Sequence, residues 1–363
     1  MNVNPAQHRP VGTRQTGDVP TFEERDLPAG RHQFHKERLM SQIHHDRLSD
    51  AAAKPAPGPR NPFLRRAVLL PAATALVGAL AVGVLLFAPG DAGDREDNRA
   101  SGPVLTTEIG AADPKGARPL LDRISLAAAD TRAPRPGAGQ YVYIETKTAN
   151  THVRTVNGKA SVVSEPLHTR QSWRSPDGLK GWLIEPGNTG PEGITLEGRD
   201  EKGDVPTPHL GAPSHDYLAA LPTDPDALLR KIYKETAGQG RGPDQQAFTT
   251  IGDLLTESWP SPRLTAALYK AAAKIPGVVS VNGATDAVGR SGVAVARLDE
   301  TSGQRTEWIF DSRSLTFLGE RTVQVEKGTA DGELIKPGTV VFTHAIMQRA
   351  FVDAIKEVPG RRG

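Results

Sequence analysis

The sequence predicts an α+β domain, in which helices cover a curved antiparallel sheet, preceded by a membrane span and an N-terminal tail. Three observations predict this arrangement. Residues 140–184 and 278–325 have strand character, three helical stretches lie between them, and residues 67–88 form one uncharged apolar run. Strands joined by short turns pair antiparallel, and an order of strands, helices and strands is typical of α+β folds.

The apolar run from Ala67 to Ala88 predicts a transmembrane helix, since about 20 apolar residues span a hydrocarbon core of about 30 Å. Arg60, Arg65 and Arg66 precede it, and acidic residues follow it. Lys and Arg mark the cytoplasmic side, so we expect a single-pass protein of the cell membrane with its N-terminus in the cytoplasm. A cleaved signal peptide fits less well, because its apolar region is about 7–15 residues long and lies near the N-terminus.

The span divides the chain into segments of different composition. Residues 1–66 are polar and proline-containing, which predicts a mostly disordered cytoplasmic tail. Residues 89–117 are acidic and then glycine-rich, which predicts a linker. We expect residues 118–363 to form the extracytoplasmic α+β domain.

One part of the tail, residues 31–48, predicts a helix. Phe34, Leu39, Met40 and Ile43 approximate an apolar stripe along it. A short exposed helix is marginal alone, so we expect a partner to cover this stripe.

Composition excludes several kinds of chemistry. The chain has no cysteine, which rules out disulfides, thiol catalysis and cysteine-based zinc sites. A net charge of +2 gives no field that favours nucleic acid, so we expect no direct nucleic-acid contact. The tail histidines lie in no HExxH motif, and we expect neither metal nor cofactor. These histidines are His32, His35, His44 and His45.

In the first half of the outer domain, a helix over 120–129 precedes several strands. Asn157-Gly158 predicts a tight hairpin within 153–163, because both turn positions need positive φ. Glycine and proline in 187–212 predict a long loop. The other expected strands are 140–148, 170–174 and 179–184.

Helices and a second set of strands follow. Asp224 before Pro225, and Ser261 before Pro262, are typical of an N-cap followed by the first helical position. We expect helices over 224–236, 245–257 and 262–275. The expected strands are 278–281, 293–298, 306–310 and 316–325, and 339–352 starts as a strand with a helix as the alternative for its end.

No motif predicts a catalytic site. Ser214-His215-Asp216 is contiguous, whereas triad members meet by folding, so we expect these residues to cap a helix. Gly289–Gly292 predicts a hairpin turn and not a nucleophile elbow. The strand glutamates are expected on solvated faces and the tryptophans in packing. These residues are Glu145, Glu185, Glu307 and Glu320, and Trp173, Trp182 and Trp308.

Several phrases resemble a family of actinobacterial single-pass membrane proteins of unknown function. The tail phrase is DLPAGRHQFHKERLM, and those of the outer domain are QYVYIETK, SWRSPDG, LPTDPDALLRKIY, LYKAAAKIPGV and WIFDSRSLTFLGERTV. Members are often encoded beside extracytoplasmic-function sigma factors, which implies a signalling or anti-sigma-like role with a sigma factor as the cytoplasmic partner. The tail lacks the cysteine ligands of the zinc-binding anti-sigma domain.

The outer domain is also similar to lipoprotein-carrier and periplasmic sigma-regulator folds, in which a half-barrel wraps around helices. A strongly curved sheet around helices would leave an apolar groove, in which an apolar extracytoplasmic ligand could bind, but likeness of fold does not by itself imply lipid binding. Two interpretations follow: a regulator that contacts a cytoplasmic partner, or an anchored module that binds a lipid or another apolar ligand without signalling. We expect no enzymatic activity.

Overall fold

The structure is a computed structural model. It describes residues 103–131, 136–137, 139–156, 159–199, 203–328 and 334–360. The predicted tail and its stripe, the span Ala67–Ala88 and the start of the linker lie outside these residues. None of the helices in the described ranges combines the length and the apolar character needed to cross a bilayer.

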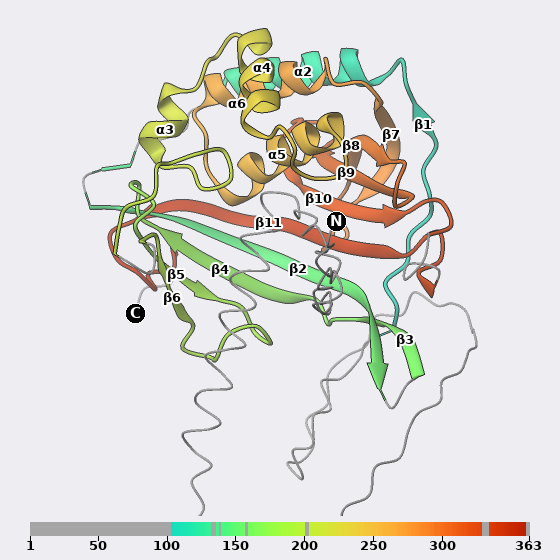
Figure 1. Cartoon of the computed structure of the whole chain (residues 1–363), viewed down its shortest axis with the longest axis horizontal. Coiled ribbons are helices and arrows are strands. Elements are labelled where there is room, and N and C mark those ends of the chain that lie inside the picture. The colour runs from blue at the N-terminus through green and yellow to red at the C-terminus, as the bar shows by residue number, and fades with distance from the viewer. Residues whose placement is uncertain are drawn as a thin grey trace, which may run out of the picture.

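The described part is α+β, as predicted, with five helices and a large antiparallel sheet (Figure 1). The helices are α2 (Ala117–Ala129), α3 (His215–Ala220), α4 (Pro225–Glu235), α5 (Pro243–Glu257) and α6 (Pro262–Ala272). The strands are β1 (Ala112–Asp113), β2 (Tyr141–Val156), β3 (Lys159–Ser164), β4 (His168–Arg174), β5 (Lys180–Ile184), β6 (Ile194–Glu197), β7 (Val278–Thr285), β8 (Ser291–Asp299), β9 (Gln304–Asp311), β10 (Phe317–Gln324) and β11 (Val340–Val352).

The sheet has 11 strands in the order β1-β7-β8-β9-β10-β11-β2-β4-β5-β6, with β3 paired to β2 outside this path. It is not closed, since β1 and β6 end the path. Register shifts interrupt the pairing of β7 with β8, β9 with β10, β10 with β11 and β11 with β2. Each irregularity of this kind bends a strand locally and increases its twist. Figure 1 shows the helices gathered on one side of the sheet.

The main core lies between these helices and the sheet. Trp308 of β9 stacks on Phe248 of α5, with ring centroids 3.9 Å apart. Tyr269 of α6 packs edge-on against Phe310. Gly252 on α5 permits this close approach, because a Cβ there would lie 2.8 Å from the Trp308 indole nitrogen.

The predicted helix caps are confirmed. The side chain of Asp224 accepts a hydrogen bond from the Ala227 amide, and Pro225 opens α4. Ser261 does the same at α6, where Pro262 is the first residue. Ser214 caps α3, as expected for the Ser-His-Asp sequence. Each cap satisfies an amide that has no partner within its helix.

Local turn chemistry also gives the hairpins correctly. Strands β2 and β3 pair up to Val156 opposite Lys159, so the hairpin is confirmed, although Asn157 and Gly158 themselves lie outside the described residues. Gly289 has a φ of 84° within the turn that joins β7 to β8.

Two predictions for longer segments are wrong. The end of 339–352 is not helical, because β11 continues to Val352 and pairs with β10 on one side and β2 on the other. The loop over 187–212 contains strand β6, which pairs with β5. In both segments, pairing with a strand elsewhere in the chain satisfies backbone groups that local propensity leaves undecided.

The expected solvation of Glu307 is also wrong, because this carboxylate is fully buried on the sheet face opposite the helices. It lies 2.6 Å from Arg305 Nη2 and 2.8 Å from Arg321 Nε. Two guanidinium groups thus neutralise one buried carboxylate, as burial of a charge requires. The sequence did not indicate that Arg305 and Arg321 would pair with Glu307, because a glutamate in an alternating strand usually faces solvent.

The chain before α2 lies along the sheet edge formed by the start of β11. The Leu105 carbonyl accepts from the Val340 amide and the Thr107 amide donates to the Gly338 carbonyl, both at 2.8 Å. Leu105 N also donates to Ser164 Oγ at 2.9 Å. We call residues 104–107 the entry strap. The expected linker of 89–117 is described only from residue 103, and β1 within it pairs with β7.

The close approach of α5 to the sheet predicts that Gly252→Ala lowers stability. The added Cβ meets the indole of Trp308, which its stack on Phe248 holds in place. Overpacking of this kind costs about 1–3 kcal/mol, which exceeds the gain in helix propensity of about 1 kcal/mol. Urea unfolding of the full-length protein measures the difference.

Gly190→Ala is the matched control, because a Cβ there meets no atom within 4 Å and the residue does not have positive φ. An equal effect of the two substitutions, or none from Gly252→Ala, would contradict this account of the packing.

Candidate functional site

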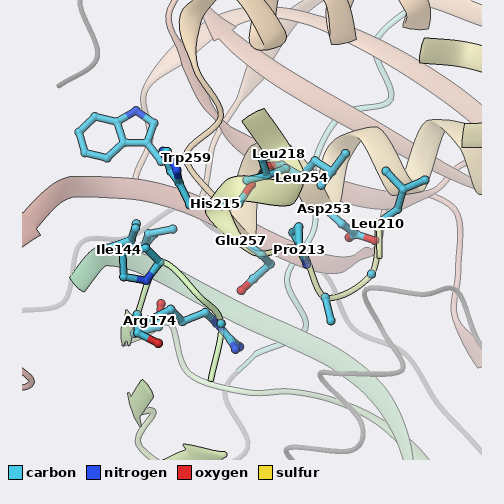
Figure 2. Close-up of a pocket in the computed structure, with 18 of the residues that line it drawn as sticks. Ile144, Arg174, Leu210, Pro213, His215, Leu218, Asp253, Leu254, Glu257 and Trp259 are labelled. Carbon is cyan, nitrogen blue, oxygen red and sulfur yellow. Dashed lines mark hydrogen bonds between the residues drawn. The ribbon is translucent and has the colours of Figure 1, made fainter. Parts of the chain in front are cut away.

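A pocket of about 140 Å³ lies between the helix-covered face of β2 and β4 and the side chains of α3 and α5. Its walls combine apolar groups with charges of both signs (Figure 2). The apolar lining residues are Val142, Ile144, Leu210, Pro213, Leu218, Leu254 and Trp259. The charged lining residues are Arg170, Arg174, Asp253 and Glu257, with His215 at the start of α3.

Strand alternation explains which residues reach the pocket. On β4, Arg170, Ser172 and Arg174 face the helices, and Trp173 points to the opposite face. Trp173 packs there against Tyr143 at a ring separation of 5.1 Å. The polar residues at positions 170, 172 and 174 are the feature of the sequence that corresponds to this polar strand face.

On α5, Asp253 and Glu257 are four residues apart and therefore lie on one side of the helix, with Leu254 beside them at the pocket. From α3, Leu218 completes the opposite wall and is itself buried.

A network of charges, in which Arg170 and Glu185 are buried, forms the floor of the pocket. Arg170 Nη2 lies 3.2 Å from Glu257 Oε2, and Arg170 Nε lies 3.6 Å from Glu185 Oε2. Glu185 Oε1 in turn lies 3.3 Å from His168 Nε2. We call these four residues the floor cluster. The expectation that Glu185 lies on a solvated face is wrong, because this side chain is buried behind Arg170.

The pKa values in the floor cluster follow from its pairing. Burial alone raises the pKa of Glu185, but hydrogen bonding to His168 and the charge of Arg170 outweigh it and hold the pKa below 4.5. For Glu257, Arg170 likewise outweighs burial and lowers the pKa. Burial lowers the pKa of His168, but the Glu185 carboxylate has the larger combined effect and raises it.

His344 of β11 lies near this cluster and behaves differently. It is buried, and its Nε2 has no hydrogen-bond partner among the described residues. Burial lowers the pKa of His344 to about 4, so the ring is neutral at physiological pH and adds no charge to the floor.

This arrangement suits binding better than proton transfer. A general acid or base works best with a pKa near the working pH, whereas both carboxylates here have lowered values and stay ionised. No group of three or more potential metal ligands occurs in the part of the chain that the structure describes. Fixed charges beside apolar walls can orient a small ligand that has both polar and apolar parts.

The remaining predicted residues lie apart from the pocket or outside the described ranges. Glu145 accepts hydrogen bonds from Tyr143 and Gln171 on the other face of the sheet. Glu320 lies close to Gly252 beneath α5 and is half-buried, so its expected place on a solvated face is wrong. The tail residues Phe34, Leu39, Met40 and Ile43, and the topology residues Arg60, Arg65 and Arg66, lie outside the description.

The packing role expected of the tryptophans is confirmed. Trp173 and Trp308 are fully buried. Trp182 lies on the sheet face opposite the helices, where its indole N–H donates to the Glu192 carbonyl and Lys356 covers its ring. Trp259, which the sequence did not single out, is the one that reaches the pocket. It follows α5 directly and stacks on Phe351 of β11 at 4.9 Å.

No protein-family model matches the chain, and no curated protein matches it.

The floor cluster predicts that Glu185→Gln lowers the free energy of unfolding by about 3 kcal/mol at neutral pH, because it leaves a buried guanidinium without one of its carboxylates. The matched control is Glu197→Gln on the adjacent strand β6, where the side chain is exposed, and its expected effect is below about 0.5 kcal/mol. Urea unfolding of the full-length protein measures both.

The effect depends on pH in a defined direction. The folded pKa of Glu185 is below 4.5, so its contribution is present above that pH and is lost on acidification through the folded value. The folded pKa of His168 is above 6.5, so its contribution is present below that pH and is lost as the pH rises through the folded value. The deficit of Glu185→Gln is largest between these limits. A deficit independent of pH would contradict the ionic account.

Proposed function

We propose that this chain is a single-pass membrane regulator whose outer domain binds a small extracytoplasmic ligand and whose tail contacts a cytoplasmic regulator such as a sigma factor. The observation that carries the proposal is the pocket beside the floor cluster, where apolar walls meet charges of both signs. The span Ala67–Ala88 would hold the domain at the membrane.

The ligand would be small and amphiphilic. The cavity of about 140 Å³ corresponds to roughly ten water-sized spheres. Leu254 and Ile144 offer apolar contact, and Arg174 and Asp253 offer charge on the same walls. A ligand with an apolar body and a dipolar group would satisfy both kinds of wall.

The regulatory part of the proposal rests on the tail. On the helix that the sequence predicts, Phe34, Leu39, Met40 and Ile43 would form an apolar stripe that an isolated helix cannot bury. The resemblance to proteins encoded beside sigma factors supplies the class of partner. A tail that served topology alone would need no such stripe.

The alternative function is a membrane-anchored module that binds a lipid or another apolar ligand without signalling. The apolar share of the pocket lining favours it. A large lipid fits less well, because core side chains fill the space between the other helices and strands β8 and β9.

The proposed topology predicts opposite labelling of two single-cysteine variants, for which the cysteine-free chain is a clean background. Ser161 is exposed on β3, so Ser161→Cys reacts with a membrane-impermeant maleimide on intact cells. Ser41→Cys reacts only after the cells are permeabilised. Labelling of both positions, or of Ser41→Cys alone, on intact cells would overturn the topology.

Crosslinking tests the regulatory function. A photo-crosslinking residue at Gln42 in the membrane-inserted full chain is expected to capture a cytoplasmic regulator that a tail-deleted chain does not. Leu39→Asp and Ile43→Asp each reduce this capture about tenfold or more, because a charge in an apolar contact is costly to desolvate. Membrane insertion stays intact in both variants. If the full chain captures no protein beyond those captured by the tail-deleted chain, the regulatory function is wrong and the alternative function remains.

The link to the pocket is tested in the same assay. Ala212 is exposed and lines the pocket, so Ala212→Trp obstructs it without entering the core. Ala219→Trp is the matched control, since Ala219 is exposed on α3 and does not line the pocket. If the pocket controls the tail, the amount of captured partner changes in Ala212→Trp and not in Ala219→Trp. Equal capture by the two variants would show that occupation of the pocket does not affect the tail.

A further inference from the structure

A second cavity, of about 210 Å³, lies on the other side of Trp259 from the first pocket, where the end of α2, the α5–α6 connection and the β9–β10 turn meet. Its walls are apolar for the larger part, and its polar lining consists of Arg349, Tyr269 and the side chains of Thr131, Thr265, Ser314 and Thr316. The apolar lining includes Ala127, Ala128, Leu255, Pro262, Leu315 and Phe317.

A bulge in β11 brings Arg349 to this cavity. Ile346 pairs with Thr146, but Gln348 pairs with Glu145 and Arg349 with Ile144, so Met347 is an extra residue. Without that residue, strand alternation would turn Arg349 toward the opposite face of the sheet. The inserted residue thus places a cation on the helix-covered face.

The guanidinium of Arg349 is incompletely partnered. One Nη2 donates to the Leu255 carbonyl, and the buried Nε has no hydrogen-bond partner. No carboxylate among the described residues forms an ion pair with it. Glu257 contributes a distant attraction, but its carboxylate is engaged by Arg170 at 3.2 Å. Burial lowers the pKa of Arg349 to about 10, which still leaves it charged at neutral pH.

Tyr269 supplies a second donor. Its ring packs against Phe310 in the core, and the residue lines the cavity. Burial raises the pKa of its hydroxyl, so the phenol keeps its proton at neutral pH and can donate it in a hydrogen bond. Tyr269 and Arg349 also interact electrostatically, which places both donors in one region of the cavity.

A buried cation without a carboxylate is unfavourable unless an anion joins it. Arginine presents donors in a planar fork that matches a carboxylate. We propose that this cavity is a binding site for a small monocarboxylate with an apolar body, whose carboxylate is held by Arg349 and Tyr269 and whose apolar part lies against Leu315 and Phe317. Arg349 is the one charged residue that the structure describes in the cavity lining, so a second carboxylate on the ligand would lack a cation and dicarboxylates are disfavoured.

The test uses the full chain in lipid nanodiscs, titrated with hexanoate and followed by ligand-observed NMR, with empty nanodiscs subtracted. Hexylamine, of equal length and opposite charge, is the probe control. We expect saturable binding of hexanoate and none of hexylamine. Arg349→Gln weakens binding about tenfold or more, since hydrogen bonds to charged groups contribute about 1.5–3 kcal/mol. Tyr269→Phe also weakens it about tenfold, because the hydroxyl donates to the same charged carboxylate.

Arg174→Gln is the matched control, because it removes a guanidinium from the first pocket and leaves this cavity unchanged. Absence of saturable hexanoate binding, or equal weakening by Arg174→Gln and Arg349→Gln, overturns the proposal. If Arg349→Gln does not fold, the hexanoate titration is carried out with Arg349→Lys and Tyr269→Phe in its place. The result is independent of tail capture, so this proposal and the regulatory function can fail separately.

Discussion

The pairing of β11 with β2 is the constraint on which the rest of the structure depends. It joins the strands that precede the helices to those that follow them, from Tyr141 opposite Val352 to Asn150 opposite Phe342. Strands β4, β5 and β6 attach on one side of this pair, and β10 to β7 on the other. Without it the two sets of strands would be separate sheets, and the first pocket would lose the wall that β2 and β4 place opposite α5.

The same pair also sets the chemistry of the two cavities. On β2, alternate residues such as Ile144 face the helices and line the first pocket. On β11, the extra residue Met347 changes which side chains face the helices from that point onward. One cavity therefore contains paired charges of both signs, and the other contains a guanidinium without an ion-pair partner among the described residues. The register shift at Met347 accounts for the place of this guanidinium in the second cavity.

Features with a local cause could be predicted from sequence. Asp224, Ser261 and Ser214 cap helices because a short polar side chain reaches an amide three residues on. Features with a distant cause could not. The end of β11 is a strand because β2 pairs with it, and residues 194–197 are a strand because β5 does. Nothing within either segment carries that information.

The candidate sites show the same division. The sequence predicted the strand over 170–174, but not that Glu185 and Glu257 would meet Arg170 there. These residues come from β4, from the position after β5 and from α5, and only folding brings them together. Trp259 likewise gave no signal, because its place between two cavities depends on its stack with Phe351. A bulge as short as that at Met347 has no sequence marker here.

The entry strap has a mechanical consequence. Its bonds to Gly338 and Val340, with the contact to Ser164, stand between the preceding chain and the helices. A pull on residue 103 would load these few hydrogen bonds first, and the aromatic stack beneath α5 would carry no tension until they gave way. The strap therefore acts as the weak link in series between the preceding chain and the domain.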